Sequence, residues 1–253
     1  MSTRPAENVP ILMYHQVSGT AHASFVKYTV TGRAFAAQMK WLAANRYRSM
    51  DLPTLLAHRR QGTPVPARTV VITFDDGFRD CAEVAAPAME AHGFTGTFFL
   101  VAGLVGATSR WLMAERGIEL PLMSWDDARG LESAGHRCES HSVTHPRLAQ
   151  LSAAACRDEL SRSRSMIEDE LGRPVRVLAY PFGSESQQVR DAAAECGYDA
   201  ACGVTIGLST AADDAYALRR VPVLGTDSLL DFISRMRTAY TVRDRLRRLI
   251  GVS

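Results

Sequence analysis

Short, nearly continuous apolar runs alternate with amphipathic runs along most of the chain, and this alternation limits the possible folds more than any other feature. Strands buried on both faces have continuous apolar sequences, and parallel strands are usually joined by helices. The pattern therefore indicates a parallel sheet covered by helices. The expected strands cover residues 9–15, 68–77, 95–103, 136–142, 175–183, 198–204 and 217–223.

About seven strand–helix units in a chain of 253 residues favour a closed barrel over an open sheet. We expect an α/β protein with a TIM-like barrel. No repeat, low-complexity stretch or linker divides the sequence, so we expect a single domain over 1–253 with its core at about 9–235. The expected helices cover 35–47, 79–93, 124–135, 152–172, 187–197 and 229–240, and the segment 104–123 is expected to be irregular.

Composition excludes several classes of protein. The net charge of +2 indicates neither a nucleic-acid partner nor a membrane surface. No stretch approaches the roughly 18 apolar residues of a membrane span, and the first residues lack a signal-peptide pattern, so we expect a cytoplasmic protein. The cysteines are odd in number and never in CxxC spacing, which argues against disulfides and a cysteine zinc site. The oligomeric state stays open.

Polar residues gather where the expected strands end. Asp75 and Asp76 follow a buried run, His15 ends the first strand, and His141 with His145 follow the fourth. In a barrel, the carboxyl ends of the strands surround one cavity. These side chains are therefore predicted to meet there.

The sequence HSVTH places His141 and His145 four residues apart, so one helical turn would bring both rings to one face. Two histidines and one aspartate commonly hold a divalent metal with open coordination positions. Adjacent carboxylates repel each other, which suggests that Asp76 and Asp75 have different partners. One would bind the metal, and its neighbour would take a proton from water whose pKa the metal lowers. The simpler alternative is a solvated turn with two surface imidazoles.

The sequences TFDDG, HSVTHP and YPFG occur in this order, starting at residues 73, 141 and 180. In this combination the chain resembles the polysaccharide deacetylases, the NodB-homology domain of carbohydrate esterase family 4, over about 9–235. The resemblance implies a distorted (β/α)7 barrel. It also implies metal-dependent hydrolysis of N-acetyl or O-acetyl groups on sugars.

Carried over by position, the resemblance implies that Asp75 is the general base. The metal ligands would be Asp76, His141 and His145, and zinc is the first choice, with cobalt, nickel or iron as alternatives for this ligand set. The backbone N–H of Phe182 matches a donor of the oxyanion hole.

Neighbouring residues are candidates for contacts with the sugar. Tyr180 and Pro181 belong to the same turn as the expected oxyanion donor. Trp125 is expected either to pack under the barrel rim or to line the sugar site, and Trp111 lies in the irregular segment 104–123, which would form a lid or a groove wall. A tryptophan face suits a sugar ring, although tryptophan more often serves packing.

Two departures from the family pattern matter. Ala179 stands where an arginine usually pairs with the catalytic aspartate, and no histidine follows His145 to act as the late acid. The branch acting on poly-N-acetylglucosamine takes its acid from an N-terminal segment, which ILMYHQV matches, so His15 is the candidate acid. Arg219 or Arg220 would replace the missing arginine.

The expected function is N-deacetylation of N-acetylhexosamine units in an acetylated oligo- or polysaccharide. His15 would protonate the amine, which is otherwise a poor leaving group. Three alternatives remain open: a catalytically impaired carbohydrate-binding module, a deformylase or other C–N hydrolase on an amino sugar, and a non-haem iron oxygenase.

Overall fold

The computed structural model describes residues 8–249, with side chains through 246. The expected single domain of 1–253 includes 1–7 and 250–253, which lie outside this description. Seven parallel strands form a closed barrel in the order β1-β10-β9-β8-β7-β6-β5, and pairing of β1 with β5 closes it. The barrel strands are β1 (Ile11–Tyr14), β5 (Thr69–Phe74), β6 (Thr97–Leu100), β7 (Arg137–Ser140), β8 (Val177–Ala179), β9 (Ala200–Ile206) and β10 (Leu218–Pro222). The predicted distorted (β/α)7 barrel is confirmed.

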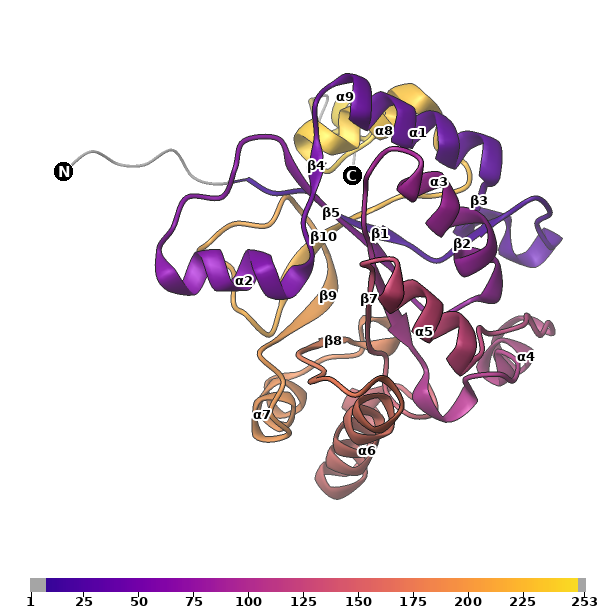
Figure 1. The fold of residues 1–253 in the computed structure, drawn as a ribbon, viewed down its shortest axis with the longest axis vertical. Helices are drawn as coiled ribbons and strands as arrows, with labels where there is room; N and C mark the ends of the chain where they lie inside the picture. Colours follow the sequence, from indigo (N-terminus) through magenta and orange to yellow (C-terminus); the bar gives the residue numbers. More distant parts are fainter. Residues whose placement is uncertain (1–7, 250–253) are drawn as a thin grey trace.

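Helices surround the strands on all sides in the view of Figure 1. They are α1 (Gly32–Ala44), α2 (Leu52–Gln61), α3 (Ala86–Glu90), α4 (Arg110–Arg116), α5 (Trp125–Ser133), α6 (Ala153–Leu171), α7 (Gln187–Glu195), α8 (Leu229–Thr238) and α9 (Val242–Leu249). Short strands β2 (Gln16–Ser18) and β3 (Thr29–Thr31) pair beside the barrel, and β4 (Arg48–Ser49) extends β5. Within the described part of the chain, none of these helices is long and apolar enough to cross a bilayer.

Alternation along the strands divides the core in two. Side chains such as Ile11, Val71 and Phe99 form a cluster inside the barrel, and leucines of α2 join that cluster. Their strand neighbours, among them Phe74 and Phe98, pack outward in the cluster that includes α1 residues. Since α2 packs with residues near the strand starts, it closes the amino-terminal end of the barrel, so the interior opens at the carboxyl ends.

Local sequence rules account for several helix boundaries. Ser124 and Asp127 form a capping box at the start of α5. The longest helix, α6, ends at Gly172 in a left-handed conformation with φ of 66°.

The segment 79–93, predicted as one α-helix, is only partly α-helical. Cys81–Ala85 is a π-helical turn that continues into α3, and the N–H of Ala86 donates to the carbonyl of Cys81. Pro87 explains the change, because proline has no N–H to donate and its ring crowds the preceding turn of an α-helix. The expected irregular segment 104–123 contains α4, and α2 was not predicted.

Candidate active site

A cavity of about 650 Å³ lies at the carboxyl ends of the barrel strands. The walls come from segments far apart in the sequence, which the barrel brings to one end. Seven of the residues predicted for the site line this cavity: His15, Asp75, Asp76, His141, His145, Tyr180 and Phe182. The polar residues that were predicted to meet at the strand ends therefore do lie around one cavity.

Asp76, His141 and His145 converge at the base of the cavity. The Nε2 atoms of His141 and His145 lie 3.4 and 3.1 Å from Oδ1 of Asp76. All three side chains are buried, and their ligand atoms lie within 4.8 Å of one another. Ligand atoms held tetrahedrally at about 2.1 Å from a zinc ion would be about 3.4 Å apart. The residues therefore fit a divalent transition metal.

Each histidine is oriented differently. Nδ1 of His141 donates to the carbonyl of Ala179 at 2.7 Å, which leaves its Nε2 free to bind a metal. The ring of His145 stacks on Trp111 at 4.3 Å and meets the edge of Phe182 at 4.5 Å. Its buried Nδ1 has no hydrogen-bond partner within residues 8–246. On the Nδ1 side, aromatic packing rather than a hydrogen bond therefore orients this ring.

The segment containing both histidines is not a helical turn, so that expectation was wrong. His145 has φ of 64° and Ser142 φ of 66°, both in the left-handed region. The N–H of His145 donates to Oγ of Ser142 at 3.0 Å. The carboxylate of Glu159 accepts bonds from the N–H groups of Val143 and Thr144 at 2.8 and 3.0 Å. Glu159 on α6 thus holds a loop whose shape, rather than a helix period, brings the imidazoles together.

The second aspartate of the pair has a different partner. Arg220 on β10 donates to both oxygens of Asp75, at 2.7 and 2.8 Å, and both side chains are buried. The same guanidinium donates to the carbonyl of Gly203 at 2.9 Å. Arg219 instead pairs with Asp213 away from the cavity. Of the two predicted arginines, Arg220 is therefore the one that contacts Asp75.

These contacts determine the charges of the two carboxylates. Burial alone would raise the pKa of Asp75, but the adjacent Arg220 guanidinium holds it below its usual range. Burial opposes ionisation of Asp76 as well, yet hydrogen bonds from His141 and His145 lower its pKa. Burial lowers the pKa of His145, which favours the neutral ring that a metal requires. Both carboxylates are therefore ionised at neutral pH.

His15 lines the same cavity. It follows β1, and its ring lies 5.1 Å from the ring of Tyr28. Gln16, the next residue, donates to Asp80 at 2.7 Å and accepts a bond from Thr29 at 2.7 Å. These bonds fix the backbone beside His15. These bonds could not be predicted from local sequence, because Asp80 is far from Gln16 along the chain.

The YPFG turn forms another part of the wall. Phe182 has φ of 58°, and its side chain is partly exposed at the cavity. Tyr180 is buried and its hydroxyl donates to the carbonyl of Tyr216 at 2.9 Å, so this hydroxyl is already occupied. Pro181 is buried and does not line the cavity.

The two tryptophans named in the sequence analysis lie in different surroundings. Trp125 begins α5, packs against the outer core and is absent from the cavity wall. Its proposed contact with the sugar therefore has no geometric support. Trp111 on α4 lines the cavity instead and covers one face of His145. A helix in the segment expected to be irregular provides this side chain.

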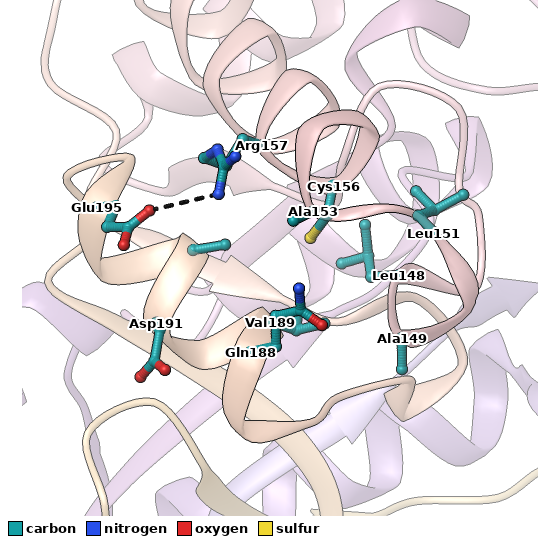
Figure 2. A pocket seen from close by; sticks show the side chains of 11 residues that line it. Leu148, Ala149, Leu151, Ala153, Cys156, Arg157, Gln188, Val189, Asp191 and Glu195 are labelled. Atoms are coloured by element: carbon teal, nitrogen blue, oxygen red, sulfur yellow. Dashed lines mark ion pairs between the residues drawn. The ribbon is translucent and has the colours of Figure 1, made fainter.

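A second, smaller hollow of about 160 Å³ lies between α6 and α7 (Figure 2). Arg157 and Glu195 form an ion pair of 3.8 Å at its edge, as Figure 2 shows. None of the predicted site residues lines it. Its wall of Leu148, Cys156 and Val189 offers no pair of groups suited to catalysis.

Comparisons with known proteins agree with this geometry. The chain is 25% identical over 223 residues to YxkH of Bacillus subtilis (strain 168), which is named as a polysaccharide deacetylase; the match covers 88% of this chain and 74% of that protein. It is 27% identical over 151 residues to the chitooligosaccharide deacetylase of Bradyrhizobium sp. (strain ANU 289), covering 58% and 60% of the two chains. The structure of the Streptococcus pyogenes deacetylase PplD in complex with acetate has the same fold, with a TM-score of 0.80 and 20% identity over 92% of this chain and 100% of that one.

The family model of polysaccharide deacetylase matches residues 62–201. This range includes the carboxylate pair, both histidines and the YPFG turn. It covers more than half of the 253 residues, so the match is to the family and not to an isolated motif. The protein is therefore a member of the polysaccharide deacetylase family.

Proposed function

We propose that this protein is a zinc-dependent N-deacetylase that removes acetyl groups from N-acetylhexosamine units of an oligo- or polysaccharide. One observation carries the proposal: two adjacent carboxylates have separate partners. Asp76 lies against two histidines, whereas Asp75 is paired with Arg220. Such a division assigns one carboxylate to a metal and leaves the other for proton transfer.

Asp76, His141 and His145 would hold the ion. The set of one carboxylate and two imidazoles suits zinc and leaves coordination positions open. When bound there, such an ion polarises the acyl carbonyl and makes a nearby water more acidic. Trp111 and Phe182 would keep the His145 ring in place by packing on it.

Asp75 would act as the general base. Its lowered pKa keeps it ionised, so it can take a proton from the water that attacks the amide carbon. The bidentate pairing with Arg220 fixes the direction of the carboxylate, and orientation is itself a large part of catalysis.

His15 and Phe182 would complete the reaction. The backbone N–H of Phe182 would donate to the oxyanion that forms as the carbonyl carbon becomes tetrahedral. His15 would give its proton to the nitrogen of the sugar, so that the C–N bond breaks with a neutral amine leaving. Both residues line the same cavity as Asp75.

The substrate class follows from the family and from the cavity. A chitooligosaccharide deacetylase is among the relatives, which supports an acetylated amino-sugar chain as substrate. The match of ILMYHQV to the branch acting on poly-N-acetylglucosamine supports a substrate of that kind, with the acid supplied from the N-terminal segment.

The test is acetate release from N-acetylglucosamine oligomers by metal-stripped protein before and after zinc is added back. Zinc should restore release in the wild type and not in Asp75→Asn. Asp126→Asn, which changes an exposed aspartate on α5, is the matched control and should behave as wild type.

Release of acetate that needs no metal would contradict the proposal. Release of formate but not acetate, from the matching N-formyl sugar, would replace deacetylation with deformylation. Binding of the sugar without any hydrolysis would favour the binding-module alternative.

A further inference from the structure

Two cationic side chains share one aromatic ring at the mouth of the cavity. Nζ of Lys27 lies 5.5 Å from the ring centre of Tyr28, and the guanidinium carbon of Arg116 lies 5.0 Å from it. The ring of Tyr28 in turn lies 5.1 Å from that of His15. All four residues line the cavity. Both cations and His15, the proposed acid, therefore lie next to the same ring, that of Tyr28.

The other cations of the cavity are neutralised. Arg147 pairs with Glu115 at 2.9 Å, and Arg235 pairs with Asp227 at 2.8 Å. Throughout the part of the chain that the structure describes, no carboxylate forms an ion pair with Lys27 or Arg116.

Arg116 is nevertheless held in place. It donates to the carbonyl of Ser24 at 3.1 Å and packs over Phe25 as well as Tyr28. The cation–π contacts supply part of the stabilisation, but a ring face does not remove the charge. Both side chains are exposed, so their charges are accessible to a ligand in the cavity. An anion that contacts both would make charge-assisted hydrogen bonds with each.

Building on the proposed deacetylation, we propose that Lys27 and Arg116 form a subsite for an anionic group, a carboxylate or a phosphate, on the acetylated saccharide. The fork of Arg116 suits two oxygens of such a group, and Lys27 adds a mobile point charge. The substrate class is then an acidic N-acetylated saccharide rather than a neutral one.

The subsite would also act on the charge of the product. Each hydrolysis leaves an amine, which is protonated at neutral pH and therefore cationic. Lys27 and Arg116 would repel a unit that is already deacetylated and attract an anionic one. The enzyme would thus select sugars that still carry acetyl groups and acid groups.

Matched substrates test this proposal directly. Zinc-loaded protein is assayed with an N-acetylglucosamine tetramer, the same tetramer with one C6 carboxylate, and the same tetramer with one C6 phosphate. At low ionic strength, kcat/KM for an anionic tetramer should exceed that for the neutral one by roughly tenfold, as for one charge-assisted contact. High salt should remove the preference, because it screens exposed charges. The anionic tetramer with the higher kcat/KM shows whether the subsite takes a carboxylate or a phosphate.

Variants then locate the preference. Lys27→Gln and Arg116→Gln should each reduce the anionic-to-neutral ratio several-fold, chiefly through KM, and the double variant should bring it close to one. Lys40→Gln removes the same charge from an exposed position on α1 outside the cavity and should keep the wild-type ratio.

Two results would overturn the subsite. One is equal kcat/KM for neutral and anionic tetramers in the wild type, and the other is an equal loss of preference in Lys40→Gln. Neither result would affect the proposed function, which these assays would contradict if no acetylated tetramer were hydrolysed.

Discussion

Asp75 and Arg220 form a two-point ion pair inside the barrel although 145 positions separate them in the sequence. Asp75 directly follows β5 and Arg220 lies on β10, and β1 pairs with both strands. The pair spans the seam at which the first and last barrel strands meet. It therefore links the chemistry of the site to closure of the fold.

Replacing Arg220 should affect catalysis and stability together. Arg220→Met leaves Asp75 buried without a partner, which costs about 3–5 kcal/mol of unfolding free energy. The pKa of Asp75 should rise, so the acid limb of the kcat/KM profile should move to higher pH. The measurement is a pH–rate profile together with chemical unfolding.

Arg220→Lys keeps the charge without the fork and should fold, with activity between that of wild type and Arg220→Met. Arg219→Met, which removes a partly exposed arginine paired with Asp213, is the control and should change stability by about 1 kcal/mol or less. An unmoved acid limb in Arg220→Lys and Arg220→Met would exclude a role for Arg220 in tuning Asp75.

Trp111 should contribute to metal affinity without touching the metal. Stacking on His145 is worth about 0.5–1.5 kcal/mol, so Trp111→Leu should weaken zinc binding by a factor of roughly 2 to 13. Competition with a chromogenic chelator measures this directly. Trp125→Leu removes a tryptophan that does not line the cavity and should leave zinc affinity unchanged. Equal effects of the two variants would mean that the change is a general loss of packing.

His15 should matter more for amides than for esters. His15→Gln should lower deacetylation of an N-acetylated sugar by roughly 10²–10⁴, because the amine then leaves without a proton. Hydrolysis of an aryl acetate should fall less, since a phenolate leaves unaided. His22→Gln, at an exposed helix cap, is the control. A parallel loss on both substrates would instead assign His15 to binding or folding.

Acid should destabilise the metal-free protein. Burial raises the pKa of Asp213, but the hydrogen bond from Arg219 outweighs it, so this pKa lies below its ordinary value, as does that of Asp75. A lowered folded-state pKa gives stability that is present above the ordinary carboxylate range and lost as the pH falls through the folded value. Unfolding free energy measured by urea between pH 7 and 3 should therefore decrease below about pH 4. Asp213→Asn should flatten part of this decrease, and an unchanged slope would contradict the assignment.

Much of the site could be predicted from the sequence because its residues directly follow buried strands. Asp75, Asp76 and His141 were found in this way, and the barrel places them together. The loop at His145 could not be predicted, because its left-handed residues depend on bonds from Glu159 on a distant helix. The sequence also could not show whether Arg219 or Arg220 contacts Asp75. Adjacent strand residues point to opposite sides of the sheet, and which of them points inward depends on register.

Trp111 was expected in an irregular segment, and only tertiary packing reveals that it covers His145. The role of α2 could not be predicted either. Leu55 and Leu56 close the amino-terminal end of the barrel, but the local sequence pattern of α2 does not distinguish it from an ordinary surface helix.

The closing seam of the barrel also has a consequence for biosynthesis. The proposed acid lies at residue 15, the proposed metal ligands lie between 76 and 145, and the partner of Asp75 lies at residue 220. A ribosome releases these segments in order, and long-range strand pairing is a late and slow event in folding. A nascent chain therefore has no complete site until its last barrel strand has emerged. An unfinished or truncated polypeptide is therefore expected to be catalytically inert.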